Sequence, residues 1–187
     1  DLAAQNHQQG KIDIAQEFYN QVLKINPNHV DANNNLGTIY HRLGNYQKSK
    51  DCYEKVIKLN PDSTDALNNL GALFFAIGKN HEAISYYKKA IKLNPNLINS
   101  YYNLGNVLFE IGEYQKSKNC YEKVIKLNAN HAEAYNDLGR VLLKLKENQR
   151  AIISFKKAID INPNSIRAQK SITNFYISNL NNFDKAI

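Results

Sequence analysis

The side chains best suited to chemistry in this sequence are asparagine carboxamides that recur at a constant spacing. Asn35, Asn69 and Asn103 are each 34 residues apart, and Asp137 follows at the same interval. A carboxamide donates and accepts hydrogen bonds, so a line of them matches the alternating N–H and C=O groups of an extended peptide. The same side chains could instead bond the backbone at a helix interface. The sequence leaves both interpretations open.

Positions around these carboxamides would complete such a binding face. His41, Phe75 and Phe109 share a second recurring position, where rings either anchor apolar side chains of a ligand or pack against the next helix. Asp137 would favour a peptide amide or a basic side chain. Asp31 and Asp65 lie toward the first half of the chain, so a ligand of mixed charge is expected. Basic residues toward the second half are Arg140, Lys144, Arg167 and Lys170. The candidate peptide-contacting residues are Asn34, Asn35, His41, Asn68, Asn69, Phe75, Tyr102, Asn103, Asn106, Phe109, Asp137 and Arg140.

Catalytic and metal-binding patterns are not found in the sequence. His7 and His41 have no carboxylate or cysteine companions at metal-ligand spacing. No serine or cysteine has a histidine base suggested by its position, and no phosphate-binding glycine motif occurs. We therefore expect a chain that is not itself an enzyme and that needs no metal or cofactor.

A Leu-Gly pair fixes the period of the whole chain. The pair recurs at 36–37, 70–71, 104–105 and 138–139, which gives units at 30–63, 64–97, 98–131 and 132–165 and partial units at 1–29 and 166–187. We expect one repeat domain over 1–187. The chain starts at Asp1 and contains no methionine, which predicts a fragment of a longer protein.

Two amphipathic helices are predicted in each unit. In the first complete unit, apolar residues recur at helical spacing over 31–43 and again over 46–58. Gly44 separates the two segments and Pro61 ends the second. Gly37 lies inside the first helix, where glycine costs roughly 1 kcal/mol relative to alanine. Close approach of the Tyr53 ring would offset that cost, and Tyr87, Tyr121 and Phe155 hold the same position in later units.

These residues resemble the tetratricopeptide repeat family. The unit at 132–165 matches the family pattern at Tyr135, Leu138, Gly139, Leu142, Ala151, Phe155, Ala158 and Pro163. Departures are Ala129 for a proline, Val56 and Val124 for a small residue, and Thr173 for the glycine; the last unit needs one extra residue to bring Ala186 into register. The resemblance implies an all-α fold, a right-handed superhelical solenoid of antiparallel helix pairs whose first helices line a concave groove.

The resemblance also implies a function in protein binding. The asparagine position is similar to the asparagine ladder of O-linked N-acetylglucosamine transferase repeat domains, which grips substrate peptides. The chain is therefore expected to bind an extended peptide in its groove or, alternatively, to be the substrate-recruiting arm of a larger enzyme such as a glycosyltransferase. The family's carboxylate clamp is not expected, because Tyr102 and Asp137 stand where a lysine and an asparagine should be.

Composition limits the other partners. The net charge is +7, but the lysines are spaced along the predicted helices with glutamates among them, as on a solvated face, so nucleic-acid binding is not expected. No apolar run is long enough to cross a membrane. Cys52 and Cys120 are expected to be free thiols in a reducing, cytoplasmic compartment. The incomplete terminal units predict apolar ends capable of end-to-end self-association.

Overall fold

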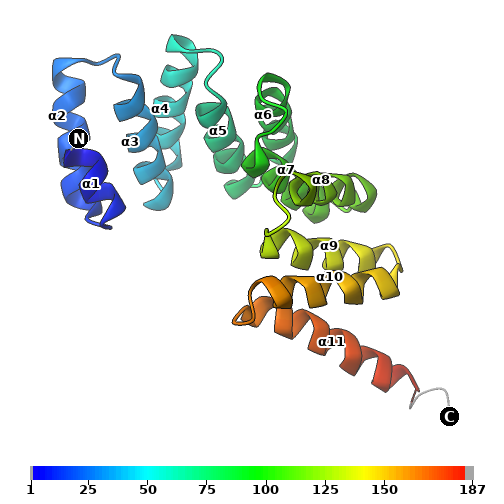
Figure 1. The fold of residues 1–187 in the computed structure, drawn as a ribbon. Coiled ribbons are helices and arrows are strands. Elements are labelled where there is room, and N and C mark those ends of the chain that lie inside the picture. The colour runs from blue at the N-terminus through cyan, green and yellow to red at the C-terminus, as the bar shows by residue number, and fades with distance from the viewer. Residues whose placement is uncertain (1, 184–187) are drawn as a thin grey trace. The chain divides into compact units, whose positions relative to one another are not determined.

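The computed structural model describes residues 2–183, with side chains described for all of these except Ala4, His7, Gln8 and 178–183. Within this part of the chain every regular element is an α-helix (Figure 1). The helices are α1 (Leu2–Gln8), α2 (Ile12–Ile25), α3 (Val30–Arg42), α4 (Tyr46–Leu59), α5 (Thr64–Ala76), α6 (Asn80–Leu93), α7 (Ile98–Glu110), α8 (Tyr114–Leu127), α9 (Ala132–Lys144), α10 (Asn148–Ile161) and α11 (Ile166–Phe183).

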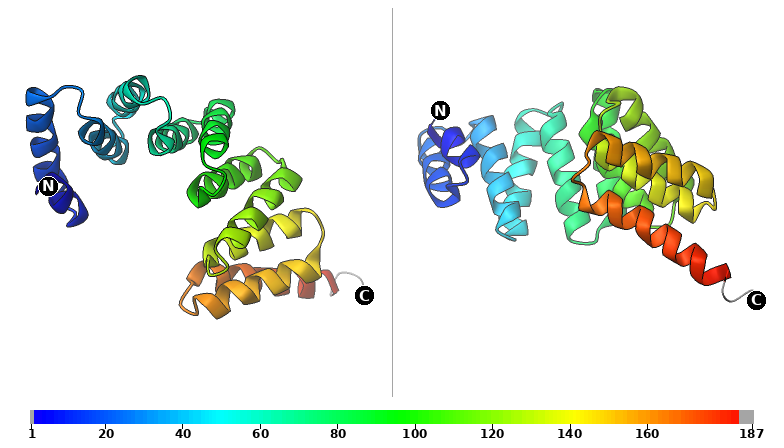
Figure 2. Two further views of the ribbon diagram at one scale, coloured as in Figure 1. Left: turned by 45° about the horizontal axis from the view of Figure 1, so that its top comes forward. Right: turned by 60° about the horizontal axis from the view of Figure 1, so that its bottom comes forward.

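The helices group into two compact units, Asp1–Leu97 and Ile98–Ile187, which divide the chain between two repeats. Within each unit, consecutive helices form hairpins, and the second helix of one hairpin packs on the first helix of the next. Figure 2 shows these pairs within each unit from two further directions. The prediction of an all-α array of stacked helix pairs is confirmed.

The glycine in each first helix lies against an aromatic ring of the second helix, as predicted. A Cβ built on Gly37, Gly71, Gly105 or Gly139 would come within 2.7, 2.8, 2.7 or 2.5 Å of that ring. The rings themselves are at most 1% exposed. In two hairpins a serine adds a bond to the same backbone, because Ser49 Oγ donates to the Gly37 carbonyl at 2.8 Å and Ser117 Oγ to that of Gly105 at 2.7 Å. Alanine replaces this serine in the two alternate hairpins, at Ala83 and Ala151.

The turn between the two helices of a hairpin uses a left-handed backbone conformation. Gly10, Gly44, Gly78 and Gly112 have φ between 73° and 79°, and Lys146 holds the same position in the next repeat with φ 62°. A side chain in this conformation costs about 1–2 kcal/mol, so Lys146 is the strained member of the series.

Replacing Lys146 with glycine is therefore expected to stabilise the protein by several tenths of a kcal/mol to about 1 kcal/mol. The substitution relieves the cost of the left-handed conformation, and the larger backbone entropy that glycine loses on folding offsets part of this gain. Urea unfolding followed by circular dichroism measures the change. The control Lys144→Gly lies within α9 and should destabilise by about 1 kcal/mol. A lower unfolding midpoint for Lys146→Gly than for wild type would contradict the prediction.

Asparagines also build the loops between hairpins. Asn26, Asn60, Asn94 and Asn128 each accept, through the side-chain oxygen, a hydrogen bond from the backbone N–H two residues later, at 3.0–3.2 Å. Three of them precede a proline in the sequence. Part of the asparagine content therefore shapes turns. The recurring Asn-Pro pair is the sequence signal for this role.

The final repeat departs from the others because α11 continues as one helix of 18 residues, whereas the other first helices from α3 onward have 13. The position of the turn residue is occupied there by Leu180, which favours a helix. Ala186, on which the predicted register of this repeat depended, lies outside the described residues.

Candidate functional site

The candidate residues of unit 1 lie on its two complete first helices, α3 and α5. We define the first-helix face of unit 1 as Asn34, Asn35 and His41 on α3 and Asn68, Asn69 and Phe75 on α5. All six are half-buried. Leu36 and Gly37, between these positions on α3, are buried against the hairpin partner. The face is therefore accessible in part and is also used for packing.

The carboxamides of unit 1 connect neighbouring helices. Asn69 Nδ2 donates to Asn34 Oδ1 at 3.2 Å, which joins α5 to α3. The Asn35 side chain acts on the Tyr19 phenol of α2, whose pKa is raised chiefly by desolvation on burial. Asn69 therefore joins two helices through another side chain, whereas the alternative interpretation expected a bond to the backbone. A carboxamide has two donor hydrogens and two acceptor lone pairs, so one such bond uses only part of its capacity.

Unit 2 carries a charged cluster at the equivalent positions, on α7, α9 and α11. Tyr102 Oη donates to Asp137 Oδ2 at 2.7 Å, with the same offset of 35 residues that joins Asn34 to Asn69. The Asp137 carboxylate is 1% exposed and also accepts from Arg140 (3.1 Å), Arg167 (2.8 Å) and Asn136 (3.2 Å). Burial, then the charge of Asp137, raises the pKa of Tyr102, so its phenol stays protonated as a donor.

Two expectations for this cluster need correction. Asp137 was expected to contact a peptide amide or a basic ligand group, but it is buried and satisfied by side chains of its own chain. Tyr102 was named as a candidate peptide contact, but it is half-buried and its hydroxyl is directed to Asp137. The groups that remain accessible are the guanidiniums, since the side chains of Arg140 and Arg167 are 39% and 54% exposed. Arg167 was named from the sequence for its charge and left out of the candidate set.

Phe109 and Asn106 also have structural partners. The Arg140 guanidinium lies 4.6 Å from the centroid of the Phe109 ring, a cation–π arrangement that orients the arginine. Asn106 Oδ1 accepts from Tyr121 Oη at 2.7 Å. In the corresponding place of the repeat at 30–63, Tyr53 Oη donates to Thr38 Oγ1 at 3.2 Å. In these two repeats the residue after the helical glycine therefore accepts a hydrogen bond from the tip of the packed ring. Asn103, also half-buried, makes an interaction of its own.

Among the candidate residues, His41 has a pKa that burial in the folded protein lowers. It packs near Tyr46, with ring centroids 5.8 Å apart, and desolvation by burial lowers its pKa below the ordinary value of 6.5. The unfolded chain therefore takes up the proton at a higher pH than the folded chain does.

We expect the contribution of neutral His41 to the free energy of unfolding to be fully present above pH ~6.5. This contribution should fall as the pH drops from there toward the lowered pKa of His41. The variant His41→Phe carries the residue found at the equivalent positions 75 and 109. The pH-dependent loss of stability that is due to His41 should be absent in this variant. Urea unfolding of both proteins at pH 8 and pH 5 measures the difference. The exposed His81, replaced by Gln, serves as control. If the pH-dependent loss were as large in His41→Phe as in wild type, His41 would not be its source.

Other site chemistries find no support in the described residues. Over residues 2–183, no group of three or more His, Cys, Asp and Glu side chains is placed to hold a metal ion. Among the described helices, none is both long and apolar enough to cross a membrane. Cys52 and Cys120 are both free, and burial raises the pKa of the Cys52 thiol to about 11.

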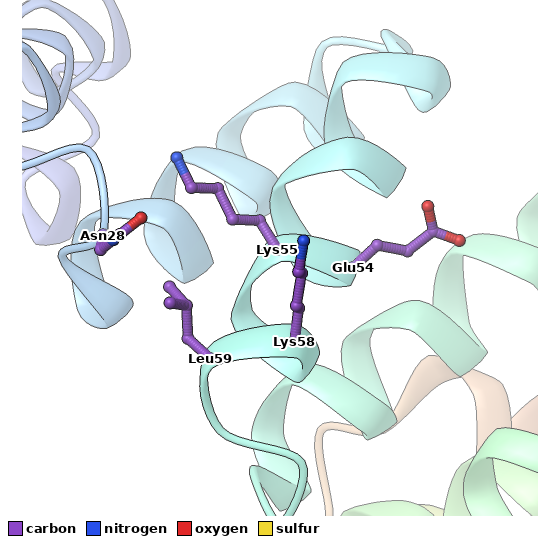
Figure 3. A pocket seen from close by; sticks show the side chains of 5 residues that line it. All are labelled: Asn28, Glu54, Lys55, Lys58 and Leu59. Carbon is purple, nitrogen blue, oxygen red and sulfur yellow. The ribbon is translucent and has the colours of Figure 1, made fainter.

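Unit 1 also has a hollow on its second-helix side, shown in Figure 3. It measures about 520 Å³ and is lined by Asn28 from the α2–α3 loop and by Glu54, Lys55, Lys58 and Leu59 from α4. None of these residues was a candidate from the sequence. Glu54, Lys55 and Lys58 belong to the charged positions that were assigned to a solvated face.

Comparison with known proteins places the repeats in a family. Models described as tetratricopeptide repeat match residues 28–96, 64–128 and 102–166, and a model described as TPR repeat matches 5–44. The chain belongs to the tetratricopeptide repeat family, as these matches and the hairpin stacking show. Comparison with curated protein sequences gives no match.

Solved structures with similar folds span most of the chain. MamA is 30% identical with a TM-score of 0.76, over 87% of this chain and 95% of that one. YrrB, described as a TPR protein with an unusual peptide-binding site, is 24% identical with a TM-score of 0.71, over 91% and 88%. A Pseudomonas aeruginosa pilF structure is 19% identical with a TM-score of 0.83, over 95% and 86%. The chain is thus a repeat scaffold of the kind that mediates protein–protein interactions.

Proposed function

We propose that the chain works by binding rather than catalysis, and that the first-helix face of unit 1 and the equivalent positions of unit 2 each hold an extended segment of a partner protein. The observation that carries this proposal is the recurrence of half-exposed carboxamides at one position of successive first helices, Asn35, Asn69 and Asn103. Asn69 is held by its bond to Asn34, and Asn103 makes an interaction of its own, so both are oriented before a ligand arrives. A preoriented group loses less conformational entropy on binding.

Main-chain recognition follows from this chemistry. The carboxamide of Asn69 keeps one N–H and both acceptor lone pairs beyond its bond to Asn34, which suits the N–H and C=O groups of an extended strand. In unit 2, the exposed guanidiniums of Arg140 and Arg167 would contact carbonyl or acidic groups of a segment bound to that unit. The peptide-binding description of YrrB agrees with this proposal, although the likeness at that identity concerns the fold.

The test is a displayed library of random 16-residue peptides, selected on the wild-type protein and re-measured on variants. Asn35→Ala/Asn69→Ala removes the carboxamides of unit 1 and Asn103→Ala that of unit 2. Each lost bond should weaken binding by about 0.5–1.5 kcal/mol. Asn119→Ala, on the exposed side of α8, is the matched control.

Because Asn69 also bonds Asn34, Asn34→Ala separates loss of the helix contact from loss of the ligand contact. Binding is measured below the unfolding transition of each variant. Selected peptides that bind all the asparagine variants with wild-type affinity would disprove the carboxamide mechanism.

Two further parts of the proposal concern the setting of the protein. The free thiols of Cys52 and Cys120 suit a reducing cytoplasm. Tyr176 and Ile177 on α11 are 46% and 50% exposed, which suits self-association through the last described helix. A single monomer mass in light scattering at high concentration would speak against self-association.

A further inference from the structure

Unit 1 contains two hollows built from the same repeat positions, one repeat apart. The α4 hollow of Figure 3 is lined by Asn28, Glu54, Lys55, Lys58 and Leu59. The α6 hollow, of about 370 Å³, is lined by Ile57, Pro61, Asp62, Leu67, Tyr86, Lys89, Lys92 and Leu93. Adding 34 to Asn28, Lys55, Lys58 and Leu59 gives Asp62, Lys89, Lys92 and Leu93. The two hollows are therefore one structural feature that recurs with the repeat.

Each hollow combines apolar surface with a pair of lysines; the α4 hollow has one leucine in its lining, whereas the α6 hollow has several apolar residues. Leu59 and Leu93 remain 39% and 44% exposed, which leaves leucine surface for a ligand. In the α6 hollow, Tyr86 is fixed by stacking on Phe74 with centroids 5.3 Å apart and an interplanar angle of 6°. Lys89 Nζ lies 5.0 Å from the centroid of the Tyr86 ring. Volumes of 370 and 520 Å³ fall within the roughly 300–1,000 Å³ of typical ligand pockets.

One acidic residue also lines each hollow, Glu54 in the α4 hollow and Asp62 in the α6 hollow, so each lysine pair exceeds the acid beside it by one charge. For Lys55, Lys58 and Lys92 no ion pair occurs within the part of the chain that the structure describes. Glu54 is paired with Lys50 on its own helix at 3.4 Å, and in Figure 3 it extends away from Lys55. The lysine pairs thus leave positive charge beside apolar surface.

We infer that the two hollows form a second docking surface, separate from the first-helix faces, for an acidic segment of a partner protein. Large apolar side chains of that segment enter the hollows beside Leu59 and Leu93. Aspartate or glutamate side chains next to them pair with Lys55 and Lys58 or with Lys89 and Lys92. We choose an acidic segment because charge complementarity favours a negatively charged partner beside the lysine pairs. The apolar surface next to the lysines favours a segment that also carries large apolar side chains.

The corresponding positions of α10 supply a control within the same chain. There Lys157 is followed by Asp160 and Ile161 at the places of Lys92 and Leu93, so the lysine pair is interrupted. Lys156 and Lys157 are both exposed. Changing them removes the same net charge from the protein without altering either hollow.

The experiment selects a displayed library of random 16-residue peptides on the full chain, and the enriched peptides are then synthesised with a fluorophore for anisotropy titration. We expect sequences in which acidic residues adjoin Leu, Ile, Phe or Tyr. Lys89→Gln/Lys92→Gln should weaken their binding by about fivefold or more, as should Leu93→Ser. Lys156→Gln/Lys157→Gln should change it by less than about twofold. Affinity should also fall as salt is raised.

Several results would overturn the inference. One is equal weakening by the α6 and α10 lysine variants, which would mean attraction by net charge alone. Another is enriched peptides that depend on Asn35 and Asn69 and ignore the hollow variants, which would leave the proposed first-helix function standing without this surface. The third is that no acidic peptide is enriched, while a labelled 20-nucleotide oligouridylate binds through Lys89 and Lys92. Circular dichroism of each variant confirms that it is folded.

Discussion

Replacing Phe155 with alanine is expected to destabilise unit 2 by about 3–5 kcal/mol. The ring is 0% exposed and lies directly on the backbone of α9 at Gly139. Its removal leaves a cavity between the two helices of a hairpin. Because each repeat is held mainly by its neighbours, the loss should also loosen the packing of α11 on α10. Urea unfolding monitored at 222 nm measures it.

The same contact predicts a strong coupling with Gly139. A Cβ at that position would lie 2.5 Å from the Phe155 ring, so Gly139→Ala alone should destabilise by about 1–3 kcal/mol through overpacking. With alanine at 155 the clash is gone and the helix propensity of alanine remains, worth about 1 kcal/mol. Gly139→Ala should then be neutral or stabilising in the Phe155→Ala background.

Phe155→Tyr is the matched control, because tyrosine holds the equivalent positions 53, 87 and 121 and is buried in each. It should cost much less than Phe155→Ala. If the effects of Gly139→Ala and Phe155→Ala were simply additive, the explanation of the helical glycine by ring packing would fail.

The second large effect is expected at Asp137. Asp137→Asn removes the charge that holds Arg140 and Arg167 and leaves one acceptor oxygen where there were two, so either Tyr102 or the arginines face an amide N–H instead of an acceptor. Removing one member of a buried ion pair usually costs 3–5 kcal/mol. Here both arginines are partly exposed and rehydrate, which reduces the expected loss to about 1–3 kcal/mol.

Chemical unfolding of Asp137→Asn, compared with Arg140→Gln and Arg167→Gln, tests this account. Each arginine variant leaves the other guanidinium on the carboxylate and should cost less than Asp137→Asn. Raising the salt concentration should change the Asp137→Asn difference little, because the carboxylate is buried. A variant more stable than wild type would show that desolvation of Asp137 outweighs its four hydrogen bonds.

The helix pairs and their main contact followed from the sequence because both depend on local spacing. Apolar residues three and four apart define each helix, and Gly44 and its equivalents mark the turns. Gly37 inside a helix already indicated close approach of a ring, since little else offsets the cost of glycine there. Where the local signal changes, as at Leu180, the hairpin pattern also changes, and α11 continues.

The candidate site was less predictable because its contacts join different positions of neighbouring repeats. Asn69 bonds Asn34 and Asp137 bonds Tyr102, so in both cases the partners are 35 residues apart and not at equivalent repeat positions. This offset arises from the stacking of first helices, and comparison of one position with its equivalents does not reveal it. Burial of Asp137 by two arginines likewise depends on Arg167 in the incomplete last repeat. The hollows required the side chains of α4 and α6 to be placed together with the loops beside them.

The alternation of serine and alanine beneath the helical glycines has a consequence for how this scaffold can be shortened or lengthened. Helices α4 and α8 have the same sequence except for Asp51 and Asn119. Lys118 of α8 pairs with Glu147, which directly precedes α10, and Glu122 of α8 pairs with Arg150 on α10. Lys118 and Glu122 have identical counterparts in Lys50 and Glu54 of α4. Excision of 64–131 would therefore present the same pairing groups to the C-terminal hairpins, whereas loss of a single repeat would bring unlike surfaces together. The interchangeable building block of this protein is a pair of repeats.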